Sequence, residues 1–131
     1  MQFNLSKKSL NNLIGVHPDL VEIVKRAIEI TEVDFVVTEG LRTLDKQKLL
    51  LKAGATTTLN SRHLTGHAVD LAALVGNEIR WDWPLYHKIA YAMKQAAKDL
   101  NTPLEWGGSW VTFPDGPHFQ LPFSVYPKLE K

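Results

Sequence analysis

Two separated segments of the chain carry side chains that could hold a metal ion. The first, SRHLTGHAVD, places His63 in a polar, turn-like stretch and Asp70 inside the apolar run Ala68–Val75. A carboxylate in an apolar strand is costly to bury unless it is paired or bound to a cation. Gly66 lets the chain turn, so that His63 can fold back beside Asp70. This segment therefore predicts a histidine and a carboxylate that lie together.

The second segment, DGPHFQL, supplies another histidine and another acid. His118 begins an apolar strand after a Gly-Pro turn, and Asp115 lies three residues earlier. His63, Asp70 and His118 would give three protein ligands, the number in a catalytic zinc site with one position left for water. Zinc lowers the pKa of such a water towards ~7, and Asp115 is placed to take its proton. From the spacing alone, histidines that only form hydrogen bonds within the fold remain an open alternative.

These segments resemble the motifs of a known family. SRHLTGHAVD resembles the SxHxxGxAxD signature of the zinc D-Ala-D-Ala dipeptidase and carboxypeptidase family, and DGPHFQL resembles that family's second motif. The similarity is greatest to the bacteriophage endolysin branch, the L-alanyl-D-glutamate endopeptidases. It covers nearly the whole chain, because VHPDL, TEGLRT and EWGGSW also match.

The resemblance implies roles for individual residues. One zinc ion per chain would be held by His63, Asp70 and His118, with Asp115 as the catalytic acid and base. Arg42 matches the arginine that contacts the substrate carbonyl and the developing oxyanion, although its position alone would equally suit a solvated side chain.

Other matched positions are less specific. Ser61 matches a serine that helps to bind substrate, and an ordinary turn serine is the alternative. In WGGSW we expect Trp110 to line a substrate groove and Trp106 to pack in the core, with Ser109 where relatives often carry aspartate. Trp81 and Trp83 are expected to be packing residues at a hairpin and a helix start.

The three remaining histidines receive no catalytic role. His17 is expected at a helix start, His67 falls at a variable position of the motif, and His87 belongs to a long helix. We therefore expect His67 to be a surface residue or a supporting neighbour of the site, and none of the three to bind the metal.

Three functions are compatible with these residues. The first is a phage-type endolysin that cuts between L-Ala and D-Glu in the peptidoglycan stem and lyses the host cell. The second is a D-Ala-D-Ala dipeptidase or carboxypeptidase. The third is a non-catalytic cell-wall binding module with a structural zinc, which would leave Asp115 and Arg42 without a role.

Length and composition limit the domain organisation, the partners and the ligand types that we expect. A chain of 131 residues suits one catalytic domain over 1–131, without a separate cell-wall-binding domain. Fifteen basic and fourteen acidic residues leave a net charge of +1, which does not favour nucleic acid as a partner. The chain has no cysteine, so thiolate ligands and disulfides are excluded. We expect a monomer that does not insert into membranes, carries no signal peptide, and stays in the host cytoplasm until it is released to the wall.

The helices and strands that must position these residues are predicted from hydrophobic periodicity and from capping, glycine and proline residues. The predicted fold is α+β, a small, mainly antiparallel sheet flanked by helices. Helices are predicted from Ser6 to Gly15, after His17-Pro18, from Thr43 to Gly54 with Leu44, Leu50 and Leu51, and from Asp82 to about Leu100. Strands are predicted at Asp34–Thr38, Ala68–Val75, Glu78–Trp81, Leu104–Trp106 and His118–Leu121.

Overall fold

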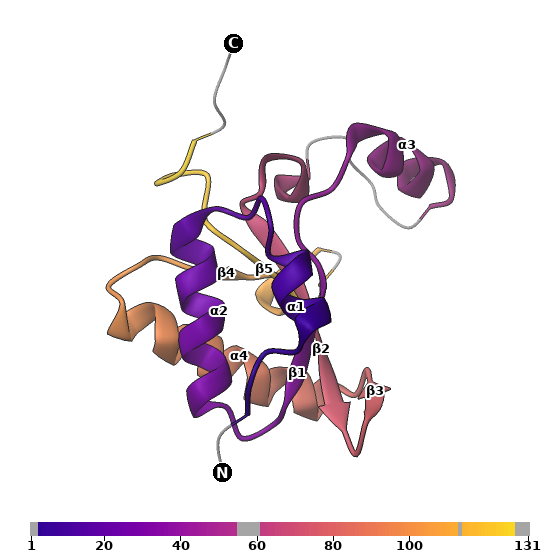
Figure 1. Cartoon of the computed structure of the whole chain (residues 1–131). Helices are drawn as coiled ribbons and strands as arrows, with labels where there is room; N and C mark the ends of the chain where they lie inside the picture. The colour runs from indigo at the N-terminus through magenta and orange to yellow at the C-terminus, as the bar shows by residue number, and fades with distance from the viewer. Residues whose placement is uncertain (1–2, 55–60, 113, 128–131) are drawn as a thin grey trace.

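The computed structural model describes residues 3–54, 61–112 and 114–127. Helices and strands follow one another along the chain without a regular βαβ alternation (Figure 1), in agreement with the predicted α+β class. In chain order the elements are α1 (Lys7–Asn12), α2 (Pro18–Ile30), β1 (Phe35–Glu39), α3 (Leu44–Lys52), η1 (Arg62–Thr65), β2 (Ala68–Val75), β3 (Glu78–Arg80), α4 (Trp83–Asp99), β4 (Glu105–Trp106), η2 (Gly107–Ser109) and β5 (His118–Gln120).

Strand β2 is the centre of the sheet. The strand order is β1-β2-β5-β4, with β3 also paired to β2, and every pairing is antiparallel. The hairpin between β2 and β3 turns at Gly76 and Asn77, whose φ angles of 56° and 70° are those that a two-residue turn requires. The predicted bounds of β2 and the mainly antiparallel sheet are both confirmed.

The hydrophobic core lies on one face of β2. Val69, Leu71 and Ala73 join a buried cluster with residues of α2 and α4. Because side chains alternate along a strand, Asp70 projects from the opposite face. The apolar side of β2 therefore anchors the strand, and its other side is available for polar groups.

Three helices begin at the residues that the sequence indicates. The Ser6 and Thr43 hydroxyls accept hydrogen bonds from Ser9 and Lys46 N–H groups, and His17 Nδ1 accepts one from the Asp19 N–H. Each contact satisfies a backbone donor that the first turn leaves unpaired. The first helix ends at Asn12 instead of Gly15, since the chain then turns through Gly15 at φ +87°.

Helix α3 differs from the others in its packing. Its buried residue is Gln47, whereas Leu44 is 50% exposed and Leu49 is 67% exposed. Figure 1 shows α3 standing away from the sheet. The predicted helix exists, but its leucines contribute little to the core. In the parts of the chain that the structure describes, no helix has the length and apolar character needed to cross a bilayer.

The tryptophans divide into two groups. Trp106 is buried, stacks on Phe119 and donates from its indole N–H to the Gly116 carbonyl over 2.7 Å, so its predicted core position is confirmed. Trp81 and Trp83 remain 57% and 44% exposed. Trp81 lies against Tyr86, and Trp83 lies against Tyr86 and Trp106, so both pack on other rings as predicted but outside the buried core.

Candidate metal centre

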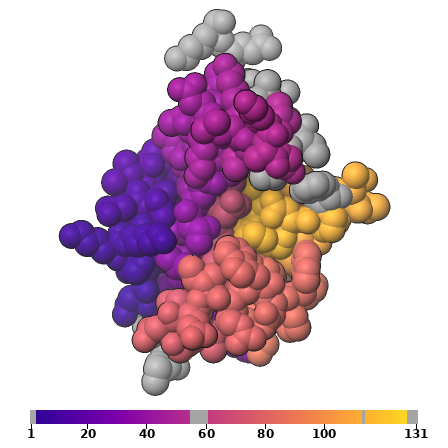
Figure 2. Space-filling model, turned by 90° about the vertical axis from the view of Figure 1, so that its right-hand side faces the viewer, coloured from indigo at the N-terminus to yellow at the C-terminus, as the bar shows by residue number. Residues whose placement is uncertain are grey.

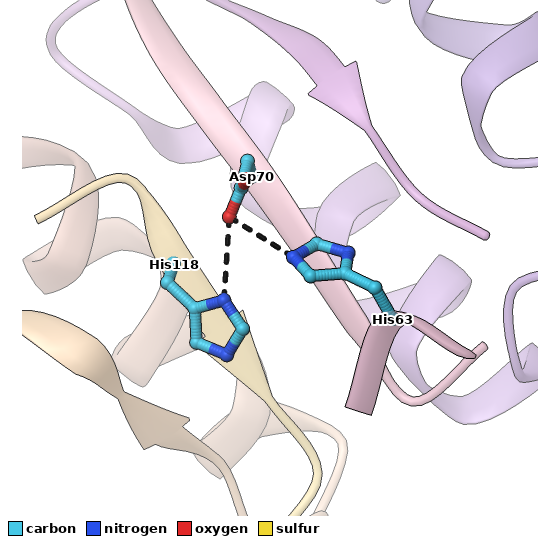
Figure 3. Close-up of side chains that lie close together, drawn as sticks. All are labelled: His63, Asp70 and His118. Carbon is cyan, nitrogen blue, oxygen red and sulfur yellow. Dashed lines mark hydrogen bonds and ion pairs between the residues drawn. The ribbon is translucent and has the colours of Figure 1, made fainter. Parts of the chain in front are cut away.

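The register of the sheet brings two of the predicted ligands together. Asp70 of β2 stands directly opposite His118 of β5. Residues opposite each other in an antiparallel pair project from the same face. His63, carried by the short helix η1, reaches the same point from the side, and Figure 3 shows the three side chains directed at one another.

His63 is held in one orientation by its own loop. The Ser61 hydroxyl accepts a hydrogen bond of 3.1 Å from the His63 N–H and caps η1. The ring is 2% exposed, and its Nδ1 lies 2.8 Å from the Gly40 carbonyl oxygen. Since a carbonyl only accepts, Nδ1 donates to it, and Nε2 is the ring nitrogen that faces Asp70 Oδ1, at 3.3 Å.

His118 is held through the opposite nitrogen. Its Nε2 lies 2.8 Å from Gln120 Oε1, and Gln120 Nε2 donates to Glu105 Oε1 over 2.6 Å. The second bond fixes the Gln120 amide with its oxygen towards the ring, so His118 Nε2 is the donor. His118 Nδ1 is then the ring nitrogen that faces Asp70 Oδ1, at 3.3 Å.

The donor set fits a divalent metal ion. His63, Asp70 and His118 each offer one atom, and these atoms all lie within 4.8 Å of one another. Two imidazole nitrogens and a carboxylate oxygen, each histidine anchored through its other nitrogen, are typical of a zinc or similar transition-metal site. Among the described residues no other histidine, aspartate or glutamate joins this group, so the predicted convergence of the three side chains is confirmed.

The charges in the His63-Asp70-His118 cluster favour binding of a cation. Burial raises the pKa of Asp70, but hydrogen bonds and charge from His118 and His63 outweigh it and hold that pKa well below its usual 3.8. Burial lowers the pKa of His118, but Asp70 raises it overall. The Asp70 carboxylate therefore stays ionised between the two histidines, and its negative charge would stabilise a bound cation.

Asp115 lies beside the cluster and outside the ligand group. Its N–H donates to the Gly107 carbonyl over 2.9 Å, and its own carbonyl accepts from the His118 N–H over 3.2 Å. The pKa of its carboxyl is raised, first by burial and then by the negative charge of Asp70. A carboxyl with a raised pKa next to a ligand cluster is suited to accept and return a proton.

Arg42 is a fixed, nearly buried cation and not a solvated one. Its guanidinium pairs with Glu39, donates to Gln47 Oε1 over 2.7 Å, and lies 3.9 Å from Asp70 Oδ2. Its backbone N–H also donates to the His63 carbonyl over 2.9 Å. The buried Nε has no hydrogen-bond partner in the described part of the chain. Arg42 is therefore anchored beside the site with a donor still unused.

The remaining sequence-predicted residues fall into different surroundings. The Trp110 ring lies 5.2 Å from the His118 ring, between centroids, and is only partly buried. His67 lies away from the ligand cluster, with Nδ1 2.7 Å from the Thr65 hydroxyl and its ring 5.3 Å from that of His17. His87 contacts Trp106 from α4. The metal-ligating group found among the described residues does not include His17, His67 or His87.

Sequence reasoning missed the residues that support the ligands. Gln120, Glu105 and Glu39 orient His118 and Arg42, and no motif marks them. The one available signal was the two-residue step from His118 to Gln120, which puts both side chains on one face of a strand. Tyr86 was also missed: its buried hydroxyl has no partner among the described residues, and burial followed by the charge of Asp115 raises its pKa to about 12.

Fold and site together define a class. A small α+β domain with an open His-Asp-His donor set, an adjacent carboxylate and a fixed arginine has the parts of a metal-dependent peptidase. Residues 1–121 match the family described as phage L-alanyl-D-glutamate peptidase. The chain belongs to that family.

Individual relatives agree with this assignment. The L-alanyl-D-glutamate peptidase of Escherichia phage T5 is 31% identical over 114 residues, which cover 84% of this chain and 83% of that protein. That of Listeria phage A118 is 33% identical over 94 residues, 72% of this chain but only 32% of the longer relative. The crystal structure of the Serratia marcescens L-Ala D-Glu endopeptidase ChiX superimposes with a TM-score of 0.92 at 46% identity, covering 97% of this chain and 96% of that one.

Proposed function

We propose that this protein is a zinc-dependent endopeptidase that hydrolyses the L-alanyl-D-glutamate bond of the peptidoglycan stem. The observation that carries the proposal is the convergence of His63, Asp70 and His118 beside a carboxylate that is not part of the ligand set. The names of the phage relatives and of the similar solved structure supply the bond.

The residues divide the work of amide hydrolysis. The zinc ion, held by His63 Nε2, Asp70 and His118 Nδ1, would supply a Lewis acid and a water of lowered pKa. Asp115 accepts the proton of the attacking water and returns it to the leaving amine. Arg42 donates to the carbonyl oxygen as negative charge develops, an effect often worth about 3 kcal/mol per donor.

Two further residues act on the substrate or its surroundings. Trp110, whose ring lies against that of His118, forms one wall of the substrate groove. Ser61 was predicted to bind substrate, and its hydroxyl already accepts from the His63 N–H. We assign Ser61 first to holding His63 in place, with its remaining hydrogen-bonding capacity available to the peptide.

The biological setting follows from the same proposal. Peptidoglycan is the partner, and the protein acts as a monomeric phage-type endolysin that is held in the host cytoplasm and released to the wall. Residues 1–131 act as one catalytic domain.

The two alternatives make different predictions. A D-Ala-D-Ala dipeptidase or carboxypeptidase on the same scaffold would release D-alanine. A binding module with a structural zinc would usually complete the ion's coordination with a fourth protein ligand. The described residues place only three candidate donors together, and Arg42 and Asp115 beside them favour catalysis.

Digestion of purified cell walls separates these functions. New L-Ala carboxyl ends and D-Glu amino ends, identified by mass spectrometry, are expected with the zinc-loaded protein and not after chelation. Released D-alanine would support the second function, and wall binding without new ends would support the third. The Asp115→Asn variant, loaded with zinc, is the matched control for a contaminating hydrolase.

A further inference from the structure

Two large aromatic rings stand partly in solvent at the edge of the candidate site. Trp81 is 57% exposed and Trp83 is 44% exposed, although both lie against other aromatic side chains. Neighbouring exposed aromatic rings beside a site are characteristic of surfaces that bind a partner. The proposed mechanism gives neither residue a role.

Trp83 is placed next to the turn that carries Asp115. A Cβ atom added to Gly116 would lie 3.4 Å from Trp83 Cη2 and 3.0 Å from Tyr86 Cδ2. The Trp83 ring is therefore one residue away from the proposed catalytic base. The Trp83 ring also packs against Trp106 and His87, whose ring centroids lie 6.4 Å and 6.1 Å from its own.

Trp81 reaches the same place through Tyr86. It directly follows β3, and its ring lies 6.2 Å from the Tyr86 ring between centroids. The Tyr86 ring in turn lies against Gly116, next to Asp115. Figure 2 shows the segment that contains β3 and the start of α4, in salmon, directly bordering the yellow C-terminal segment that contains His118.

The substrate of the proposed reaction requires a sugar near this position. In the peptidoglycan stem, L-alanine is joined to the lactyl group of N-acetylmuramic acid. Only one amino acid, which spans at most about 3.6 Å, separates the L-Ala–D-Glu bond from that lactyl group. The muramic acid ring must therefore lie within roughly 10 Å of the reacting carbonyl, next to the metal ligands.

We propose that Trp81 and Trp83 form a ledge that binds the pyranose ring of N-acetylmuramic acid on the acyl side of the cleaved bond. This inference rests on the proposed endopeptidase function and names what that site recognises beyond the peptide. The flat faces of the indole rings pack against the C–H face of the sugar, while its hydroxyl groups stay in water.

Two matched substrates test the ledge. One is N-acetylmuramoyl-L-Ala-D-Glu with the rest of the stem, and the other is the same peptide with an acetyl group in place of the sugar. We expect Trp81→Ala and Trp83→Ala each to lower kcat/KM on the muramoyl substrate about threefold to tenfold, the range of a single aromatic contact. The loss should appear in KM, and cleavage of the acetyl peptide should change less than twofold.

Control variants keep the result interpretable. Tyr91, 73% exposed on α4, is the matched exposed aromatic, and Tyr91→Ala should leave both substrates unaffected. Trp81→Phe and Trp83→Phe keep a flat ring and should restore most of the preference for the muramoyl substrate, even if an alanine variant folds poorly. Equal losses on the two substrates, or none on the muramoyl one, would overturn the proposal.

A binding measurement separates this inference from the proposed function. With the inactive, zinc-loaded Asp115→Asn variant, titration calorimetry should show binding of N-acetylmuramoyl-L-Ala, and adding Trp81→Ala or Trp83→Ala should weaken that binding about threefold to tenfold. Binding without cleavage by the wild-type protein would refute the endopeptidase and keep the ledge. Cleavage of both substrates with equal efficiency would keep the endopeptidase and refute the ledge.

Discussion

Replacing Gln120 by leucine should weaken metal binding without unfolding the protein. Gln120 is 6% exposed, and its side chain connects His118 Nε2 at 2.8 Å to Glu105 Oε1 at 2.6 Å. Leucine fills a similar volume but accepts no hydrogen bond. His118 can then rotate, or move its proton from Nε2 to Nδ1, the atom that faces Asp70. Either change removes a metal donor.

The size of the effect follows from what the hydrogen bond controls. A buried N–H left without an acceptor costs about 1–3 kcal/mol. That cost is present with and without metal, so only the part that depends on ring orientation and tautomer affects affinity. Outer partners of metal-binding histidines typically contribute 10–100-fold. We therefore expect about a tenfold rise in the zinc dissociation constant, or about 1.4 kcal/mol.

Competition with a chromophoric chelator measures this change directly. Gln95→Leu is the control, since Gln95 bonds Asp99 on the exposed side of α4, and its zinc affinity should equal that of the wild-type protein. Glu105→Gln should have a smaller effect than Gln120→Leu, because a glutamine at 105 can still accept from Gln120. Wild-type zinc affinity in folded Gln120→Leu would refute the idea that this hydrogen bond selects the ligand atom of His118.

Four further outcomes test the site. Asp115→Asn should retain stoichiometric zinc but lose about 10²–10⁴ of kcat in a cell-wall assay, the usual range for a general base, and full turnover would refute that role. His63→Ala should lose both bound zinc, measured by elemental analysis, and activity, whereas a folded variant that keeps the metal would show that His63 is not a ligand. Arg42→Lys keeps the positive charge but loses the forked guanidinium that Glu39 and Gln47 hold in place. We therefore expect kcat to fall about 10²-fold or more with KM little changed, and an unchanged kcat would show that Arg42 does not contact the oxyanion. In the metal-free protein, burial raises the pKa of Asp70, but hydrogen bonds from His118 and His63 lower that pKa below the unfolded value of 3.8. The ionised Asp70 therefore stabilises the fold fully above pH 3.8, and this stabilisation is lost as the pH falls through the folded pKa. Urea unfolding should then show wild-type stability falling more steeply than that of Asp70→Asn as the pH drops from about 5 to 3, and parallel curves would contradict this assignment.

Local signals predicted the elements well because each depends on neighbouring residues. Ser6, His17 and Thr43 cap the helices that were expected to follow them. The apolar run at 68–75 forms β2 with the predicted bounds, since a strand buried on its core face and ended by Gly76-Asn77 has little freedom to shift. The three predicted ligand residues were also found together, because an acid in such a strand must be compensated by something nearby.

Tertiary surroundings explain what the sequence did not reveal. The leucines of α3 stay exposed because the helix stands away from the sheet, which no local periodicity can report. Arg42 was equally compatible with a solvated position, and its burial depends on Glu39, Gln47 and Asp70 meeting around it. Helix periodicity and strand alternation describe one element at a time, whereas these environments arise between elements.

The register between β2 and β5 decides whether the site exists at all. Asp70 and His118 are 48 residues apart in sequence and become neighbours through the antiparallel pairing of β2 with β5, which the 2.9 Å hydrogen bond from the Leu71 N–H to the Pro117 carbonyl extends. A slip of one residue would turn His118 into the core and bring Phe119 to the metal side. Gly116, in the turn before β5, leaves room for the Tyr86 ring, because a Cβ there would lie 3.0 Å from Tyr86 Cδ2. The core residues of β2 and β5 thus support the metal site by fixing the register that places Asp70 opposite His118. Core substitutions that loosen this pairing should reduce metal affinity before they unfold the chain.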